Sequence, residues 1–179
     1  MIVAISGSGG TGKTVVAEEL VKRLKKSGKK YKLVVLNKLA ERTKAYAGYD
    51  KRRQSKIVKL GKLKAEVKKL AKKHKNIVME GHFAHFFPAD ITIILRCDPR
   101  VLERRLKKKY DWPTKITENV EAEMINLITE ESLPMHKLGT VFEIDTTRRT
   151  KIQTAKAIED IMKGSKNYAA GKINWLKSI

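Results

Sequence analysis

The stretch that decides the fold is MIVAISGSGGTGKT, residues 1–14. Its apolar run Ile2–Ser6 is short and predicts a buried strand, and a glycine-rich turn follows directly. From residue 13 to about residue 26 the apolar side chains recur at helical spacing, with Val16, Leu20 and Leu24 on one face. A strand that passes through a glycine-rich turn into a helix indicates an α/β protein.

The turn, residues 7–14, satisfies the pattern G-x-x-x-x-G-K-[ST]. Between a strand and a helix this pattern is typical of a P-loop, whose backbone N–H groups and following helix N-terminus bind phosphate. Lys13 is expected to reach the β and γ phosphates of ATP or a related nucleotide, and the Thr14 hydroxyl to bind Mg²⁺. An ordinary glycine-rich turn is the alternative, which this spacing disfavours. The residues predicted to contact the nucleotide are Gly7, Gly9, Gly10, Thr11, Gly12, Lys13 and Thr14.

An acidic residue is also expected near the P-loop. In P-loop proteins a carboxylate at the end of another buried strand usually orients the waters of the magnesium ion. Glu80 closes a predicted strand at residues 77–80 and is the candidate, together with Thr14, for the metal site. The alternative is a carboxylate that caps a helix or pairs with a lysine. His82 could orient water or touch a phosphate, or it could have no role.

A basic segment before a proline-broken stretch is a candidate lid. Its cations are Arg100, Arg104, Arg105, Lys107, Lys108 and Lys109. Mobile cations suit a lid, because they stabilise the charge that spreads over a transferred phosphoryl group and exclude water. A basic, solvated helix face is the alternative and accounts for several of these residues.

The remaining periodicity indicates alternating strands and helices. Further strands are predicted at residues 32–36, 77–80, 91–96 and 141–144. Helices are predicted from residue 38 onward, at 54–74, from the Asp98-Pro99 start signal to about 109, from 116 to about 134, and at 150–162. One α/β domain over residues 1–179 is therefore expected, with a five-stranded parallel sheet flanked by helices in a P-loop NTPase fold.

The composition is strongly basic. There are 40 Lys and Arg against 19 Asp and Glu, for a formal net charge of +21. This excess favours a polyanionic partner, with RNA the expected one, because lysine and arginine bind phosphates whatever the sequence. The basic residues around the predicted helix at 54–74 face one acid, Glu66. A heat-adapted or merely soluble surface is the alternative, although ion-pair networks would raise Glu together with Lys.

Other functions are disfavoured by what the sequence lacks. No apolar stretch approaches the roughly 20 residues that span a membrane, and no basic leader precedes residue 5. A cytoplasmic protein without a membrane partner is therefore expected. The single cysteine, Cys97, allows no internal disulfide and indicates a small buried side chain.

With these motifs placed, the chain resembles the nucleoside monophosphate kinases, and most closely the adenylate kinase isoenzyme 6 type of archaea and eukaryotes. The resemblance covers residues 1 to about 145 and is carried by the P-loop and by residues 39–50, 80–88 and 95–106. The stretch EGHFAHFFP at 80–88 is the most specific, because the family there has an acidic residue, any residue, His and shortly afterwards Phe-Phe-Pro.

The resemblance implies a monophosphate-binding region at about residues 31–56 and a short lid at about 108–117. It implies that Val15 and Lys109 also contact ATP. The expected catalytic residues are Lys13, Glu80, His82 and Arg105. The family phosphorylates nucleoside monophosphates, mainly AMP, hydrolyses ATP slowly, and engages a small-subunit ribosomal protein during maturation of the small ribosomal subunit. The same activities, a ribosomal protein and rRNA are thereby implied for this chain.

Several positions depart from the family pattern, and Lys51, Arg52 and Arg53 replace the acidic run that the family has after Tyr-Asp. Glu80 stands where the family usually has Asp, Lys109 where the lid usually has Arg next to Gly, and Glu41 where the monophosphate region has Arg. Two other functions stay open. One is an ATP-switched ribosome-assembly factor whose kinase activity is incidental, and the other is a kinase for a different small molecule, with Asp50 as the candidate base.

Overall fold

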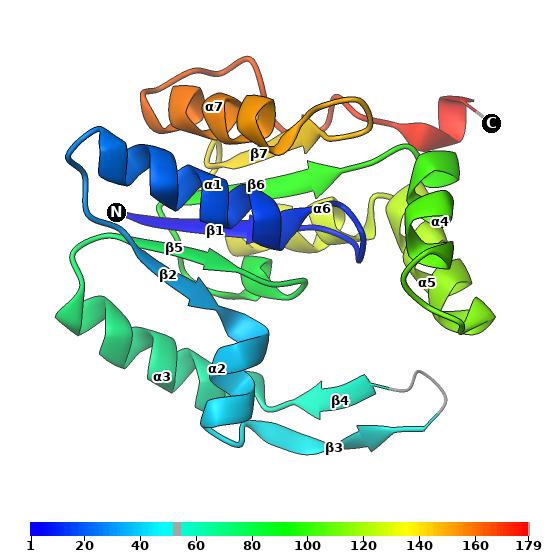
Figure 1. Cartoon of the computed structure of the whole chain (residues 1–179), viewed down its shortest axis with the longest axis horizontal. Helices are drawn as coiled ribbons and strands as arrows, with labels where there is room; N and C mark the ends of the chain where they lie inside the picture. The colour runs from blue at the N-terminus through cyan, green and yellow to red at the C-terminus, as the bar shows by residue number, and fades with distance from the viewer. Residues whose placement is uncertain (52–54, 179) are drawn as a thin grey trace.

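A computed structural model of the chain describes residues 1–51 and 55–178. Among these residues, five strands form a parallel sheet in the order β2-β5-β1-β6-β7 (Figure 1). The strands are β1 (Ile2–Ser6), β2 (Lys32–Val35), β5 (Ile77–Glu80), β6 (Ile91–Arg96) and β7 (Val141–Asp145). β1 lies at the centre, between β5 and β6, and the predicted five-stranded parallel sheet is confirmed.

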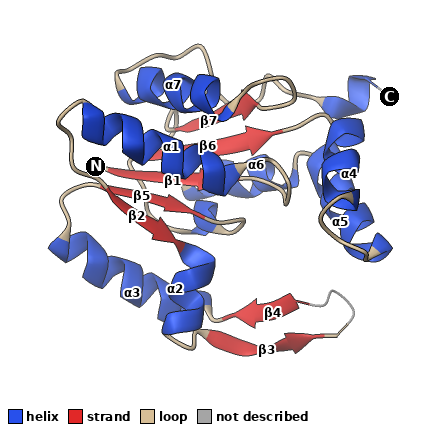
Figure 2. Ribbon diagram, viewed as in Figure 1, coloured by secondary structure: helices blue, strands red, loops and turns tan. Residues whose placement is uncertain are grey.

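Helices cover both faces of this sheet (Figure 2). α1 (Lys13–Lys26) and α7 (Lys151–Met162) pack on one face, and α2 (Leu36–Arg42) and α3 (Leu60–Lys73) pack on the other. α4 (Pro99–Lys107) and α5 (Pro113–Met124) follow the carboxyl end of β6. None of the helices in the described part of the chain is long and apolar enough to cross a membrane.

The core follows from the alternation of side chains along β1. Val3, Ala4 and Ile5 are fully buried. Because successive strand residues point to opposite faces, Val3 and Ile5 pack with α1 and α7, whereas Ala4 packs with α2 and α3. A smaller cluster around Leu102 and Leu106 joins α4 to α5. The helix start predicted at Asp98-Pro99 is also confirmed, since the Asp98 side chain accepts a hydrogen bond from the Arg100 N–H.

The helix predicted at residues 54–74 is wrong in its first part. Residues Ser55–Val58 form strand β4, which pairs antiparallel with β3 (Tyr46–Asp50), and the helix α3 begins only at Leu60. Ile57 fits a helical period in sequence, yet its side chain is 49% exposed in the hairpin rather than facing a core. The predicted start at Gln54, and the basic residues Arg52 and Arg53, lie outside the described residues.

The single helix predicted from residue 116 to about 134 is also wrong. The chain turns at Asn126, whose φ of 57° is left-handed, so α5 ends at Met124 and a separate α6 (Leu127–Ser132) begins. A short 3-10 helix (Leu133–Met135) follows. The apolar period continues through this break, although α5 packs mainly against α4 and α6 packs against β6. Two smaller boundaries also differ, since β2 ends at Val35 and α2 begins at Leu36 rather than at Lys38.

The C-terminal segment, for which no structure was predicted, lies along β7. The Glu143 N–H donates to the Tyr168 carbonyl at 2.8 Å, and Phe142 forms an antiparallel bridge with Ala169. The chain then passes to a 3-10 helix at Trp175–Ser178.

The capping box of α7 gives a test of the fold. The Thr150 hydroxyl accepts the Gln153 N–H at 3.2 Å, and the Gln153 side chain accepts the Thr150 N–H at 2.9 Å. Thr150→Ala is expected to lower the free energy of unfolding by about 1 kcal/mol, measured by urea denaturation, because it removes one cap. Thr150→Ser keeps the hydroxyl and should retain most of the stability. Equal stabilities of the two variants would show that the cap contributes nothing.

Candidate nucleotide-binding site

The backbone of the P-loop requires glycine. Residues 7–12 connect β1 to α1, and Gly7, Gly10 and Gly12 have φ angles of 140°, 84° and 94°. A Cβ atom on Gly7 would lie 2.4 Å from the Leu95 carbonyl oxygen of β6, and one on Gly10 would lie 3.0 Å from the Leu102 side chain. The loop is therefore held against β6 and α4 in a conformation that other residues would strain.

The side chain of Lys13 lies back over this loop. Its Nζ donates to the carbonyl oxygens of Gly7 at 2.9 Å and Ser8 at 2.8 Å. Burial lowers the pKa of Lys13 to about 8, an effect that the negative charge of Glu80 opposes and the positive charge of Lys109 increases. The loop thus provides two backbone acceptors for the Lys13 ammonium.

Thr14 and Glu80 lie together, as predicted for a metal site. β5 pairs with β1 so that Glu80 stands beside Ile5, and Thr14 follows in the first turn of α1. The Thr14 hydroxyl donates to Glu80 Oε1 at 3.1 Å, and Glu80 is only 4% exposed. A hydroxyl and a carboxylate are hard oxygen ligands that suit Mg²⁺, which usually keeps water and phosphate oxygens as its other ligands. The described residues contain no cluster of three or more His, Cys, Asp or Glu side chains that could hold a metal.

His82 follows β5 at the same edge of the sheet. The Ser6 hydroxyl donates to the His82 carbonyl at 3.1 Å, which ties this turn to the end of β1. Desolvation and then the positive charge of Lys13 lower the pKa of His82 from its ordinary value, which favours the neutral ring at pH 7. The structure therefore places His82 within the electrostatic reach of Lys13, and its predicted contact with water or phosphate stays a prediction.

A second histidine supports this arrangement and was not predicted as a site residue. His85 is buried, its Nδ1 lies 2.8 Å from the Ser6 hydroxyl, and its Nε2 lies 3.1 Å from Glu131. Burial lowers the pKa of His85 to about 4, and the neighbouring His136 adds to this effect. A neutral His85 thus supports the strand end from which the P-loop starts.

Of the predicted lid cations, Arg105 and Lys109 lie near the P-loop, but at different places. Arg105 donates to the carbonyl oxygens of Thr146 at 3.0 Å and Thr147 at 3.1 Å, in the loop after β7. The Thr146 hydroxyl in turn donates to the Thr11 carbonyl at 3.1 Å. Lys109 instead lies over the Tyr110 ring, 5.3 Å from its centre. Arg105 is thus fixed beside the P-loop, whereas Lys109 lies at the turn between α4 and α5.

Two residues of α5 that the sequence did not identify contact the P-loop directly. The Gly9 N–H donates to Asn119 Oδ1 at 2.9 Å, and the Ser8 hydroxyl donates to Glu123 Oε2 at 2.8 Å. Their spacing of four residues puts both on one helix face. That spacing is visible in the sequence, but nothing in it indicates that this face meets a loop more than a hundred residues away.

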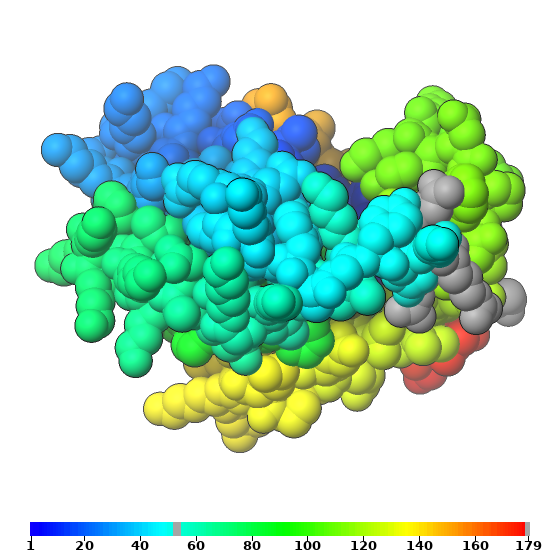
Figure 3. All heavy atoms as spheres, turned by 90° about the horizontal axis from the view of Figure 1, so that it is seen from below, coloured from blue at the N-terminus to red at the C-terminus, as the bar shows by residue number. Residues whose placement is uncertain are grey.

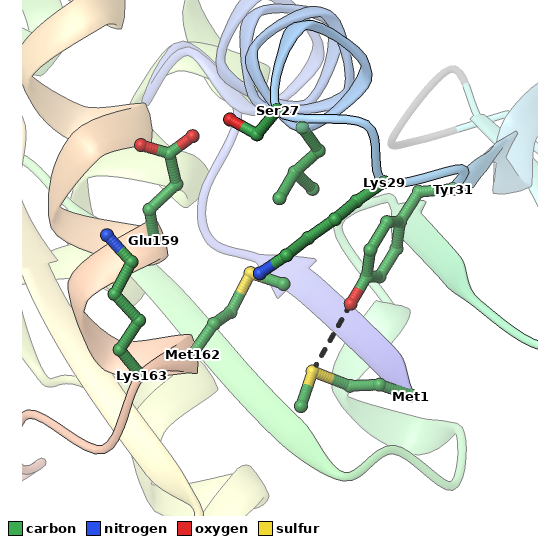
Figure 4. A pocket seen from close by; sticks show the side chains of 8 residues that line it. Met1, Ser27, Lys29, Tyr31, Glu159, Met162 and Lys163 are labelled. Atoms are coloured by element: carbon green, nitrogen blue, oxygen red, sulfur yellow. Dashed lines mark hydrogen bonds between the residues drawn. The ribbon is translucent and has the colours of Figure 1, made fainter.

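A separate cavity of about 110 Å³ lies at the opposite edge of the sheet (Figure 4). Met1, Tyr31 and Met162 line it, where β1 and β2 begin and α7 ends. The P-loop follows the carboxyl end of β1, so this cavity is no part of the candidate site.

These features define the class of protein. A glycine-rich loop at the carboxyl end of a central parallel strand, a lysine and a threonine at the start of the next helix, and a buried carboxylate on the neighbouring strand form the site of a P-loop nucleotide-binding protein.

Comparison with known proteins identifies the family. A family profile described as "AAA domain" matches residues 3–126. Over full length the chain is 34% identical to a "Putative adenylate kinase" of Archaeoglobus fulgidus, covering 100% of this chain and 94% of the relative. It is 36% identical to proteins of the same name from Pyrococcus furiosus, covering 99% and 92%, and from Methanosarcina mazei, covering 100% and 100%. The chain belongs to this adenylate kinase-like family of P-loop proteins, and it is a kinase-like, ATP-binding enzyme.

Solved structures agree on the fold. Shikimate kinase from Bacteroides thetaiotaomicron superimposes with a TM-score of 0.60 at 16% identity, over 91% of this chain and 98% of that one. Shikimate kinase from Acinetobacter baumannii in complex with shikimate gives 0.59 at 13% identity, over 90% and 92%. At these identities the likeness concerns the fold alone.

The lowered pKa of Lys13 makes nucleotide binding depend on pH in a way that can be measured. Below pH 8 Lys13 is mostly charged, and above it mostly neutral. ATP raises the pKa again, so binding should take up about half a proton at pH 8 and much less at pH 6.5. The proton uptake is measured by calorimetric titration with MgATP in buffers of different ionisation enthalpy. Lys13→Arg stays charged and should abolish the difference between the two pH values. Equal uptake in both proteins would contradict the assignment.

Proposed function

We propose that the protein is a Mg²⁺-dependent nucleoside monophosphate kinase of the adenylate kinase type, which converts ATP and AMP into two molecules of ADP. The observation that carries the proposal is the hydrogen bond of 3.1 Å between Thr14 and Glu80, next to Lys13 and the glycine-rich loop. The names of the full-length relatives support it. Slow ATP hydrolysis is expected as a side reaction when no monophosphate is bound.

In this proposal the protein acts by positioning and by charge rather than by covalent chemistry. The P-loop amides and Lys13 hold the β and γ phosphates. Thr14 and Glu80 hold Mg²⁺, which when bound neutralises charge on the phosphates. His82 is neutral and can donate to or accept from a water or a phosphate oxygen without adding positive charge.

The acceptor and the lid are assigned to the flanking segments. The monophosphate-binding region proposed at about residues 31–56 includes α2, β3 and the first residues of β4, and the lid proposed at about 108–117 includes the turn from α4 to α5. Gly7, Gly9, Gly10, Thr11, Gly12 and Val15 would contact ATP. Arg105 and Lys109 would stabilise the charge of the transferred group. Lys109 provides a point charge in place of the paired donors of an arginine. It is therefore expected to stabilise the charge of the phosphoryl group more than to fix its orientation.

Glu80 and a panel of monophosphates test the proposal together. ADP formation from MgATP, followed by chromatography with and without AMP, CMP, GMP or UMP, should be stimulated strongly by AMP. Glu80→Gln keeps the shape of the side chain but loses its charge, and should slow this turnover by about tenfold or more, which is about 1.4 kcal/mol of activation free energy. Glu66→Gln, a half-buried carboxylate of α3 that pairs with Lys69 instead of Thr14, is the control and should match the wild type.

Either of two results would contradict this proposal. Turnover of Glu80→Gln within about twofold of the wild type would remove Glu80 from the magnesium site. Hydrolysis that is slow and indifferent to every monophosphate would instead favour the ATP-switched assembly factor.

The basic surface of α3 supports a second candidate function, binding to RNA in a ribosomal particle. The exposed side chains of α3 project from the face seen in Figure 3. Lys68, Lys69, Lys72 and Lys73 of this helix are all exposed, and Lys69 forms an ion pair with Glu66. A row of lysines with few acids binds phosphates irrespective of sequence. A ribosomal protein and rRNA remain proposed partners on this basis.

Charge reversal tests this surface. Replacing Lys68, Lys69, Lys72 and Lys73 by Glu should weaken binding of a fluorescent single-stranded RNA about tenfold or more at 0.1 M salt and make it less dependent on salt, while ATP affinity stays the same. The control reverses the exposed Lys22, Lys151, Lys156 and Lys163 on α1 and α7, across the sheet. An equal loss in both variants would show that only net charge matters.

A further inference from the structure

The C-terminal segment contacts two buried carboxylates. After pairing with β7, the chain donates the Gly171 N–H to Glu143 Oε2 at 2.7 Å, and four residues later the Trp175 indole N–H donates to Glu123 Oε1 at 3.0 Å. Both acids are almost fully buried, with 4% and 3% exposure. The segment therefore provides polar contacts inside the protein and does not merely cover an apolar surface.

Arg96 joins the two carboxylates. It is 1% exposed, and its guanidinium donates to Glu123 Oε1 at 2.7 Å and also to Glu143. The Cys97 N–H donates to the same Glu123 oxygen at 3.1 Å. Glu123 Oε1 thus accepts from Arg96, Cys97 and Trp175, and these three donors fix the direction of the carboxylate.

The second oxygen of Glu123 reaches the P-loop. Its Oε2 accepts the Ser8 hydroxyl at 2.8 Å, and the Ser8 carbonyl accepts from Thr11 Oγ1 at 2.9 Å and from Lys13 Nζ at 2.8 Å. Ser8 is 3% exposed, so its position is set by these partners rather than by water. Glu123 is therefore linked through Ser8 to the carbonyl oxygen that accepts the Lys13 hydrogen bond.

We propose that the C-terminal segment is a positioning element for nucleotide binding, in which Trp175 orients Glu123 and Glu123 holds Ser8 in the shape that accepts the phosphates. The inference rests on the ATP binding that the proposed function requires. A loop already held in its bound shape loses less conformational entropy on binding.

Two conservative variants remove single donors. Trp175→Phe keeps a large ring and loses the indole N–H, and Ser8→Ala loses the hydroxyl. Each should weaken MgATP binding about three- to tenfold in calorimetric titration, because each removes one of the two hydrogen bonds that link Trp175 to Ser8 through Glu123. In turnover assays the KM for ATP should rise by a similar factor while kcat stays within about twofold. The control Tyr168→Phe removes a hydroxyl from the same segment without touching Glu123 and should bind ATP like the wild type.

The double variant decides whether the two residues act together. If Trp175 acts through Glu123 on Ser8, Trp175→Phe combined with Ser8→Ala should bind ATP only slightly more weakly than the weaker single variant. Fold-changes that multiply would show independent effects and overturn the inference. A lower melting temperature of Trp175→Phe with unchanged ATP affinity would also overturn it, because the segment would then be a structural anchor only. The wild-type ATP affinity comes from the same titrations, so a lack of stimulation by AMP would contradict the proposed kinase without affecting this result.

Discussion

A Cβ atom on Gly7 would lie 2.4 Å from the carbonyl oxygen of Leu95, so the chain leaves β1 through a turn that glycine alone can make at this distance from β6. The site depends on this close approach. It brings the P-loop to the carboxyl edge of the sheet between β5 and β6, where Glu80 stands beside Ile5 in the parallel register. Thr14, the second residue of α1, therefore contacts Glu80 directly through its short side chain. The hard-oxygen pair of the candidate metal site is thus a consequence of strand order.

The sequence predicted those parts of the molecule whose signals are local. The P-loop, the strand that precedes it and the Asp98-Pro99 helix start are each encoded within a few residues, and all were predicted correctly. The placement of Glu80 at a strand end was also readable, because the run before it is short and apolar. Its meeting with Thr14 follows once β5 is placed next to β1.

The remaining parts depend on contacts that sequence patterns do not report. Ile57 fits the helical period of the residues after it, but an exposed hairpin pairing with β3 overrides that period. The break at Asn126 is caused by one left-handed residue in an otherwise continuous apolar pattern. The contacts of Asn119 and Glu123 with the P-loop, and of Trp175 with Glu123, join residues that are far apart in the chain. Trp175 was assigned no function from the sequence, since an indole in a mixed basic tail has no local signature.

The buried charges around Arg96 hold several elements of the fold in place. A buried ion pair is often no more stabilising than well-packed apolar side chains, because desolvation offsets the attraction. What the Arg96 cluster adds is direction, since it fixes β6, β7, α5 and the C-terminal segment to one another through hydrogen bonds of defined geometry. Positive charge at the site works differently, because Lys109 and Lys115 act over distance on Lys13 and His82 and need no fixed geometry. In the proposed kinase the backbone of the P-loop, held from behind by Glu123, would therefore set the orientation of the phosphates. The lysines would supply charge, and an anion would relieve the repulsion among them.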